Sequence, residues 1–140
     1  MAGCPLLKIF LDTAALIDLL AGNARAISSI DKLRVASLFY TSPINIYEVL
    51  CGISILKSGK EKEMQALSAL LANITVLSID SQTACLAAEI YCELRSKGKP
   101  INEPDYLIAA SAISNGIFTL ITQNKKPFEN IPAITSIITY

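Results

Sequence analysis

The chain has 140 residues, of which 52% are hydrophobic and 17% charged, and twelve basic and twelve acidic residues give zero formal net charge. This length suits one domain over residues 1–140 with a substantial core, and the apolar composition excludes a disordered chain. A neutral chain has no overall positive field to attract nucleic acid, so RNA binding would depend on local basic patches and bound cations.

Two further features of the composition narrow the possible chemistry. The chain has no histidine, which excludes Ser-His and Cys-His nucleophile pairs, an imidazole general base and His-ligated zinc. The four cysteines show no paired metal spacing, and Cys51, Cys85 and Cys92 lie within apolar helical patterns. We therefore expect these three to be reduced core residues of a cytoplasmic protein. Catalysis would have to come from carboxylates and metal ions.

The apolar N-terminal stretch is interrupted by Lys8, Asp12 and Asp18, which argues against a signal peptide. No uninterrupted apolar run reaches the roughly 18 residues that a membrane span needs. The apolar share is high for a small monomer, so we expect an apolar surface that a partner covers or that forms a homodimer.

Apolar runs of strand length alternate with helical patterns along the whole chain. Strands are expected at 8–11, 38–42, 74–78, 117–122 and 134–139. Helices are expected at 13–20, 24–37, 45–57, 60–72, 81–97 and 103–115. This alternation predicts an α/β fold, a parallel sheet of four to five strands with helices on both faces in an α/β/α sandwich.

The helix expected at 81–97 has two apolar series. Leu86, Ile90 and Leu94 recur every fourth residue, and Cys85 and Cys92 lie seven residues apart. Both spacings are typical of one apolar helix face, so we expect both series to be buried.

Three carboxylates stand at the boundaries of these elements. Asp12 directly follows the first strand, Glu48 lies one helical turn beyond the second, and Asp105 lies at the start of the last helix. In open parallel sheets, ligands bind beyond the carboxyl ends of the strands where the strand order reverses. All three acids can therefore face one crevice.

Carboxylates that converge repel one another unless a cation is bound or their pKa values rise. Oxygen ligands suit hard cations such as Mg²⁺ or Mn²⁺. A water on such a cation could attack a phosphorus atom while the metal stabilises the leaving oxygen. The three acids therefore favour a metal-dependent phosphodiesterase.

Each acid also has a purely structural explanation. Asn45 with Glu48, and Asn102 with Asp105, have the spacing of a capping box, in which the acid bonds back to the first residue's amide. Asp12 could be an acid in a first helical turn, favoured by the helix dipole.

Five stretches of the chain resemble the PIN-domain ribonucleases in residue types, order and spacing, and they most resemble the VapC-type toxins of prokaryotic toxin–antitoxin pairs. These stretches are Lys8–Leu20, Ser42–Gly52, Asn102–Ala112, Thr122–Asn124 and Phe128–Pro132. The resemblance extends from about Ile9 to the end of the chain. Capping does not explain why all three acids occur together in the family's order.

The resemblance implies a metal-dependent endoribonuclease, the toxin of a type II pair, with Mg²⁺ or Mn²⁺ as cofactor. It implies Asp12, Glu48 and Asp105 as catalytic metal ligands, with Thr13 orienting Asp12 or a ligand water. It further implies that Thr122 bonds an Asp carboxylate or water and that Asn124 is a neutral ligand or positions a water. A separately encoded antitoxin would occupy an apolar groove and place a basic residue among the acids.

Candidate RNA contacts come from the basic patches. The residues are Arg95, Lys97, Lys99, Lys125 and Lys126, and a further patch comprises Lys57, Lys60 and Lys62. Each patch also has a simpler interpretation as solvated surface.

The chain departs from the family pattern at two positions. Ala14 stands where a polar residue commonly follows Asp-Thr, and Pro127 stands where the family usually has a fourth acid before the Phe. Pro127 cannot bind a metal through its side chain, so Glu103 or Glu129 would have to substitute in a two-metal site.

These departures, with the neutral charge, leave open an alternative from another class: a PIN-like module with weakened catalysis that binds RNA or a protein partner. An Asp-nucleophile phosphatase is disfavoured because Ala14 stands where such enzymes have a second Asp. The absence of a Gly-rich Lys-Ser/Thr loop excludes a Walker-type nucleotide site.

Overall fold

The computed structural model describes residues 3 and 5–140, so Cys4 lies outside the described residues. Within these residues five strands form one parallel sheet in the order β3-β2-β1-β4-β5. The strands are β1 (Leu7–Leu11), β2 (Ser37–Thr41), β3 (Thr75–Val76), β4 (Thr119–Ile121) and β5 (Ser136–Ile138). The helices are α1 (Thr13–Leu20), α2 (Ala24–Leu33), α3 (Pro43–Ser54), α4 (Lys60–Leu71), α5 (Ser81–Ser96) and α6 (Glu103–Ser114).

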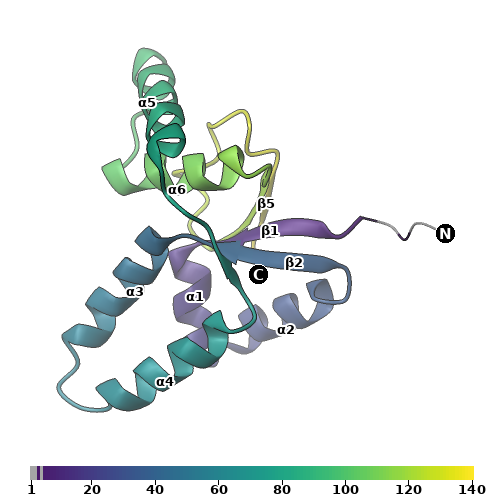
Figure 1. Cartoon of the computed structure of the whole chain (residues 1–140), viewed down its shortest axis with the longest axis vertical. Helices are drawn as coiled ribbons and strands as arrows, with labels where there is room; N and C mark the ends of the chain where they lie inside the picture. The colour runs from purple at the N-terminus through teal and green to yellow at the C-terminus, as the bar shows by residue number, and fades with distance from the viewer. Residues whose placement is uncertain (1–2, 4) are drawn as a thin grey trace.

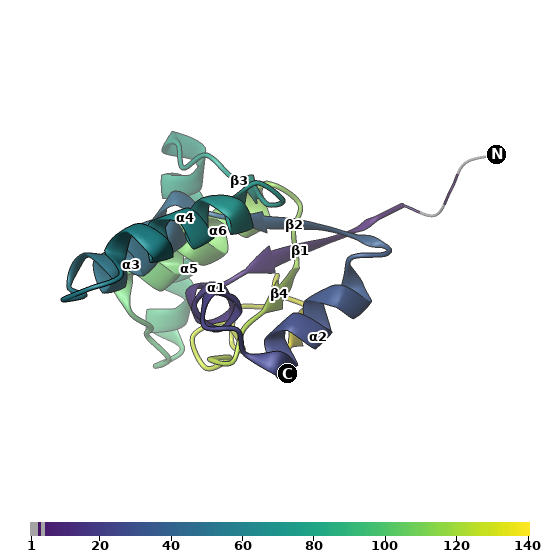
Figure 2. The same ribbon diagram turned by 90° about the horizontal axis from the view of Figure 1, so that it is seen from below.

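Helices cover both faces of the sheet, as the sequence predicts. Figure 1 shows α5 and α6 on one side of the sheet and α1, α3 and α4 on the other, and Figure 2 shows the same layers from below. Side chains of β1 alternate between the two layers: Phe10 packs with α5 and α6, while Ile9 and Leu11 pack with α1 and α3. The sheet is therefore the buried middle layer of an α/β/α sandwich.

The strand order reverses at β1. From β1 the chain first adds β2 and β3 on one side, and then passes to β4 and β5 on the other. The carboxyl ends of β1 and β4 adjoin, since Leu11 pairs with Ile121 and the Asp12 amide donates to the Ile121 carbonyl at 3.2 Å. Asp12 and Thr122, the next residues of each strand, thus lie side by side at the point where parallel sheets bind ligands.

The second helix ends earlier than the sequence predicts, at Leu33 rather than at residue 37. The Ala36 amide turns back onto the Leu33 carbonyl at 3.2 Å, and the Ala36 carbonyl accepts from the Leu7 amide at 3.0 Å. Pairing with β1 therefore takes this segment out of the helix. The boundaries of the other elements differ from the expected ones by a few residues; α3, for example, begins at Pro43 rather than at residue 45.

The expectation of buried cysteines is wrong for the three that the structure describes. Cys51, Cys85 and Cys92 are free and exposed. In α5 the buried residues are Thr83, Ala87, Ile90 and Leu94, which form one stripe at the helical repeat. Cys85 and Cys92 lie about half a turn around the helix from this stripe. The series through Ile90 and Leu94 is thus the one that meets the core, and the other faces solvent.

None of the helices in residues 3 and 5–140 has the length and apolar character needed to cross a membrane.

Candidate active site

Asp12 is held rigidly at the end of β1. Its side chain is 6% exposed, and each carboxylate oxygen accepts a hydrogen bond. The Thr122 hydroxyl donates to Oδ2 at 2.9 Å, and the Asn45 amide nitrogen donates to Oδ1 at 3.2 Å. Burial raises the pKa of Asp12 and the charge of Glu48 raises it further, while bonds from Thr13, Thr122 and Asn45 act in the opposite direction. Burial and Glu48 therefore disfavour the ionised form of Asp12, while the three hydrogen-bond donors stabilise it.

Asn45 links Asp12 to Glu48 through a buried polar chain. The Ser42 hydroxyl donates to the Asn45 side-chain oxygen, which fixes the orientation of the amide. The two amide hydrogens then go to Asp12 and to the Thr13 hydroxyl, the latter at 3.0 Å. The Thr13 hydroxyl in turn donates to Glu48 Oε1 at 2.7 Å. Thr13 thus orients Glu48. Asn45 orients Asp12, which is the role that the resemblance implies for Thr13.

The capping-box explanation is wrong for both helices. The residue that caps α3 is Ser42, whose hydroxyl accepts a hydrogen bond from the backbone amide of Asn45. Asn45 therefore lies inside the helix, and its side chain is fully buried. Asn102 does precede α6, but its side chain makes no cap hydrogen bond. Asp12 lies just before α1, outside its first turn, and its side chain likewise does not cap. Neither Glu48 nor Asp105 therefore completes a capping box.

Asp105 approaches the other two acids from α6. It is half-buried in the first turn of the helix, and no side-chain hydrogen bond holds its carboxylate within the described residues. Burial, followed by the charges of Asp12 and Glu48, raises its pKa to about 6. Three acids from separate parts of the chain therefore lie close enough for their charges to interact.

The donors at this site suit a hard divalent cation in kind. They are carboxylate oxygens backed by hydroxyl and amide groups, and burial followed by the charges of Asp12 and Glu48 raises the pKa of Asp105, so a cation would favour its ionised form. The carboxylates are not drawn tightly together: within residues 3 and 5–140, no three Asp, Glu, Cys or His side chains have the spacing of ligands around one ion. A cation that keeps most of its waters, held directly by one or two carboxylates, fits this looser arrangement.

The residues around the missing fourth acid lie beside Asp105. Lys126 and Pro127 line a small hollow of about 200 Å³ together with Asp105 and Asn102. The Asn124 backbone amide donates to the Thr122 hydroxyl at 3.0 Å, while the Asn124 side chain is exposed. The position of Pro127 is thus at the site, with the ammonium of Lys126 next to it.

The remaining candidates lie outside this acid cluster. Glu103 and Glu129 are exposed and do not contribute to the raised pKa of Asp105. The first patch is engaged locally: Arg95 stacks over Tyr91, Lys97 pairs with Glu93 at 2.9 Å, and Lys99 bonds Asn130. Lys125 is exposed, as are Lys57, Lys60 and Lys62.

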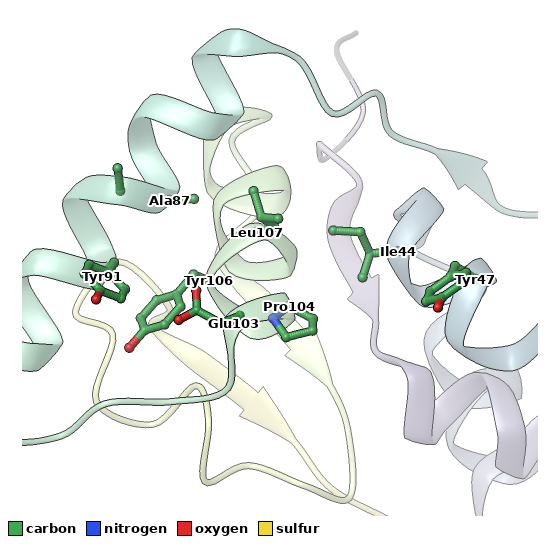
Figure 3. Close-up of a pocket in the computed structure, with 9 residues that line it drawn as sticks. Ile44, Tyr47, Ala87, Tyr91, Glu103, Pro104, Tyr106 and Leu107 are labelled. Carbon is green, nitrogen blue, oxygen red and sulfur yellow. The ribbon is translucent and has the colours of Figure 1, made fainter. Parts of the chain in front are cut away.

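An apolar groove borders the acids. It has a volume of about 550 Å³ and runs between α3 on one side and α5 and α6 on the other. Figure 3 shows Tyr47 and Ile44 on the α3 wall, facing Pro104 and Leu107 of α6. Because Tyr47 precedes Glu48, and Pro104 precedes Asp105, the groove opens directly beside the acid cluster.

Sequence reasoning missed two residues of this network as site residues. These residues are Ser42, which directly follows β2, and Asn45. Asn45 lies three residues before Glu48, so Asn45 and Glu48 share one face of α3. That spacing was available in the sequence but was interpreted as capping. Tyr140 and its partner Asp18, which also border the site, carry no comparable signal because they are far apart in the chain.

The family is shown by a match to the PIN-domain model. The model, described as "PIN domain", matches residues 9–134. The chain therefore belongs to the PIN-domain family.

Individual relatives narrow this to the VapC type. The chain is 30% identical over 130 residues to the tRNA(fMet)-specific endonuclease VapC of Salmonella typhimurium, covering 92% of this chain and 96% of that protein. The structure of DNA-bound VapBC from Salmonella typhimurium superposes with a TM-score of 0.82 at 28% identity, covering 96% and 98% of the two chains. VapBC2 from Rickettsia felis, bound to a promoter DNA fragment, has the same fold, with a TM-score of 0.85 at 24% identity, covering 96% and 99% of the two chains. The chain is a VapC-type member of the family.

Proposed function

We propose that this chain is a metal-dependent endoribonuclease that hydrolyses RNA phosphodiester bonds and acts as the toxin of a type II toxin–antitoxin pair. The observation that carries this proposal is the convergence of Asp12, Glu48 and Asp105 beyond the carboxyl ends of β1 and β4, where burial, followed by the charges of Asp12 and Glu48, raises the pKa of Asp105 to about 6. The VapC endonuclease of Salmonella typhimurium supports the same function.

Asp12, Glu48 and Asp105 would hold the cation, which we propose to be Mg²⁺ or Mn²⁺ because the donors are oxygens. When bound, it supplies Lewis-acid chemistry and a water of lowered pKa. Hydrolysis of the phosphodiester would join a water oxygen to the phosphorus and break the bond to the leaving ribose oxygen, which would take up a proton.

The protein's own groups supply orientation. Thr122 and Asn45 fix both oxygens of Asp12, and Thr13 fixes one oxygen of Glu48 and leaves the other free. Lys126 lies beside Asp105, where its charge suits an RNA phosphate. Asp105, without such a bond, is the carboxylate that can adjust when a cation binds.

The apolar groove beside the acids is the proposed antitoxin site. Related structures such as VapBC from Salmonella typhimurium are toxin–antitoxin complexes. Tyr47 is 65% exposed at the groove wall, where an apolar segment of a partner would cover it. The acids would attract a basic side chain at the end of that segment, and this side chain would block cation binding.

We also propose that the protein forms a homodimer and lies in the cytoplasm, and two further apolar features support the homodimer. Ile55 is 80% exposed at the end of α3, and Ile17 of α1 is 48% exposed beside a hollow that Leu56 also lines. Apolar residues exposed to this extent favour association. Sedimentation of the purified protein over a range of concentrations tests the dimer.

RNA cleavage tests the proposed nuclease. Purified, chelator-washed protein is incubated with tRNA(fMet) and with a mixed structured RNA, with and without Mn²⁺ or Mg²⁺, beside the Asp12→Asn variant. We expect cuts that require the metal and fall at least about 100-fold in the variant. If wild type and variant behave alike, and calorimetry detects no metal binding to either, the binding-module alternative replaces the nuclease.

Two substitutions of an alanine by glutamate test the antitoxin groove. Ala88 lines the groove and Ala84, one turn away on the same helix, does not, although both are exposed. A small protein encoded beside this chain's gene would be co-expressed with each variant as the proposed antitoxin. We expect Ala88→Glu to lose co-purification and Ala84→Glu to retain it; equal recovery with both variants would place the partner elsewhere.

A further inference from the structure

Tyr140 lies two residues beyond β5, at the same edge of the sheet as the acids. Its ring is half-buried against the layer that contains α1 and α3. Its hydroxyl donates to Asp18 Oδ2, on the last turn of the helix that follows Asp12. Burial raises the pKa of Tyr140 above its ordinary value, followed by the hydrogen bond to Asp18 and the charges of Asp18 and Asp12. The phenol therefore lies close enough to Asp12 to experience its charge.

Gln123 connects Tyr140 to the loop that follows β4. The Gln123 side-chain amide donates to the Tyr140 carbonyl, and its side-chain oxygen accepts from the Tyr140 amide at 3.3 Å. The side chain therefore pairs with the backbone of residue 140 as a neighbouring strand would. Just before it, the Thr122 amide donates to the Ile138 carbonyl at 3.0 Å. Residues 122 and 123 are thus fixed along the segment that carries Tyr140.

This fixed loop is the one that aims Thr122 at Asp12. The Thr122 hydroxyl accepts from the Asn124 amide at 3.0 Å and donates to Asp12 Oδ2 at 2.9 Å. The accepted bond leaves the hydroxyl proton free to point at the carboxylate. Contacts therefore run in a ring from Asp12 through Thr122, Gln123 and Tyr140 to Asp18, which returns to Asp12 along α1.

We propose that Tyr140 is a positioning residue of the active site, which holds the Thr122 hydroxyl on Asp12 through Gln123 and fixes α1 through Asp18. This inference rests on the proposed function for its catalytic meaning, because Asp12 is the ligand being oriented. Tyr140 acts only through other residues. Groups that orient a metal ligand from outside strongly affect metal affinity.

The Tyr140→Phe variant removes the hydroxyl and keeps the ring. Calorimetric titration with Mn²⁺ alone is expected to show a Kd about 3- to 10-fold weaker than wild type, less than for a group that touches a ligand directly. Hydrogen exchange at the Asn124 amide is expected to be faster, because its acceptor Thr122 becomes less well held. In RNA cleavage, kcat is expected to fall by a similar factor with KM unchanged.

Two controls separate positioning from mere stability. Tyr40→Phe removes a tyrosine hydroxyl that makes no hydrogen bond within the described residues, and it should leave the Mn²⁺ affinity unchanged. Asp18→Ala removes the acceptor of the phenol and should weaken Mn²⁺ affinity as Tyr140→Phe does, whereas Asp18→Asn keeps an acceptor oxygen and should weaken it less.

The outcomes are distinct. If Tyr140→Phe lowers Tm but binds Mn²⁺ like wild type, the residue is only structural and the proposal is overturned. A raised KM with unchanged kcat and Mn²⁺ affinity would instead place Tyr140 in contact with RNA, which also overturns it. A wild type that binds Mn²⁺ but cuts no RNA removes the proposed function, yet the Mn²⁺ and exchange comparisons still decide the role of Tyr140. A wild type that binds no Mn²⁺ overturns both.

Discussion

Asp12 and Asp105 belong to one cluster, but the fold holds them differently. Asp12 follows a central strand, is almost fully buried, and accepts hydrogen bonds on both oxygens from Thr122 and Asn45. Asp105 projects from the first turn of α6, is half-buried, and has no side-chain donor within the described part of the chain. One side of the site is therefore preorganised and the other is adjustable.

This difference indicates how the site could bind and release a cation. A rigid carboxylate fixes where the ion sits, and a free one completes the coordination when the ion arrives. Burial of Asp105, followed by repulsion from Asp12 and Glu48, makes its ionised form unfavourable in the metal-free site and raises its pKa to about 6. Four experiments test whether the two sides really differ in this way.

The largest effect is expected from Asp105→Asn. The amide removes a charged ligand, so RNA cleavage should fall at least about 100-fold, as for Asp12→Asn. Metal-free Asp105→Asn should be at least as stable as wild type at pH 7, because a repelled carboxylate has been removed. A variant that keeps full activity would show that Asp105 is not part of the catalytic set.

Thr122→Val tests the rigid side. Valine has the same shape as threonine without the hydroxyl, so Asp12 loses one donor and the Mn²⁺ affinity should fall by about 10- to 100-fold. Thr119→Val, on the same strand, is the matched control and should bind Mn²⁺ normally, because its hydroxyl makes no contact with the acids in the described structure. Equal affinities in the two variants would contradict the assigned role of Thr122.

The pH dependence of stability tests the adjustable side. The pKa of Asp105 rises from 3.8 to about 6 on folding, so the folded protein binds this proton more tightly than the unfolded chain does. The resulting stabilisation is complete below pH 3.8 and is lost as pH rises through about 6. As the pH rises between these two values, the Tm of the metal-free wild type should therefore decrease relative to that of Asp105→Asn. Parallel curves would show that folding does not raise the pKa of Asp105.

Lys126→Ala is expected to have the smallest effect. Loss of one phosphate contact beside Asp105 should raise KM a few-fold, leave kcat unchanged, and reduce the slope of log affinity against log salt by roughly 0.7. Lys57→Ala, beyond the far end of α3, is the control and should leave the salt dependence unchanged. A slope that changes in neither variant would remove Lys126 from the RNA contacts.

The sequence was sufficient for the fold class and for the prediction that the three acids lie close together. Alternating apolar runs and helical patterns predicted the parallel sheet and every helix, because a strand buried on both faces reads as an apolar run. Errors arose where tertiary contacts decide. The segment at 34–37 leaves the helix because β1 pairs with it, and the cysteines of α5 are exposed because a different stripe meets the core.

By itself, then, the sequence determined which chemistry is available: carboxylates without histidine, placed where a sheet of this kind binds ligands. Only the tertiary structure decided which groups support those carboxylates. Asn45 became a donor to Asp12, and Tyr140 came to lie beside Asp18, 122 residues away in the chain. Such partners are set by how strands and helices pack, and a contact between distant residues leaves no periodicity in a single sequence.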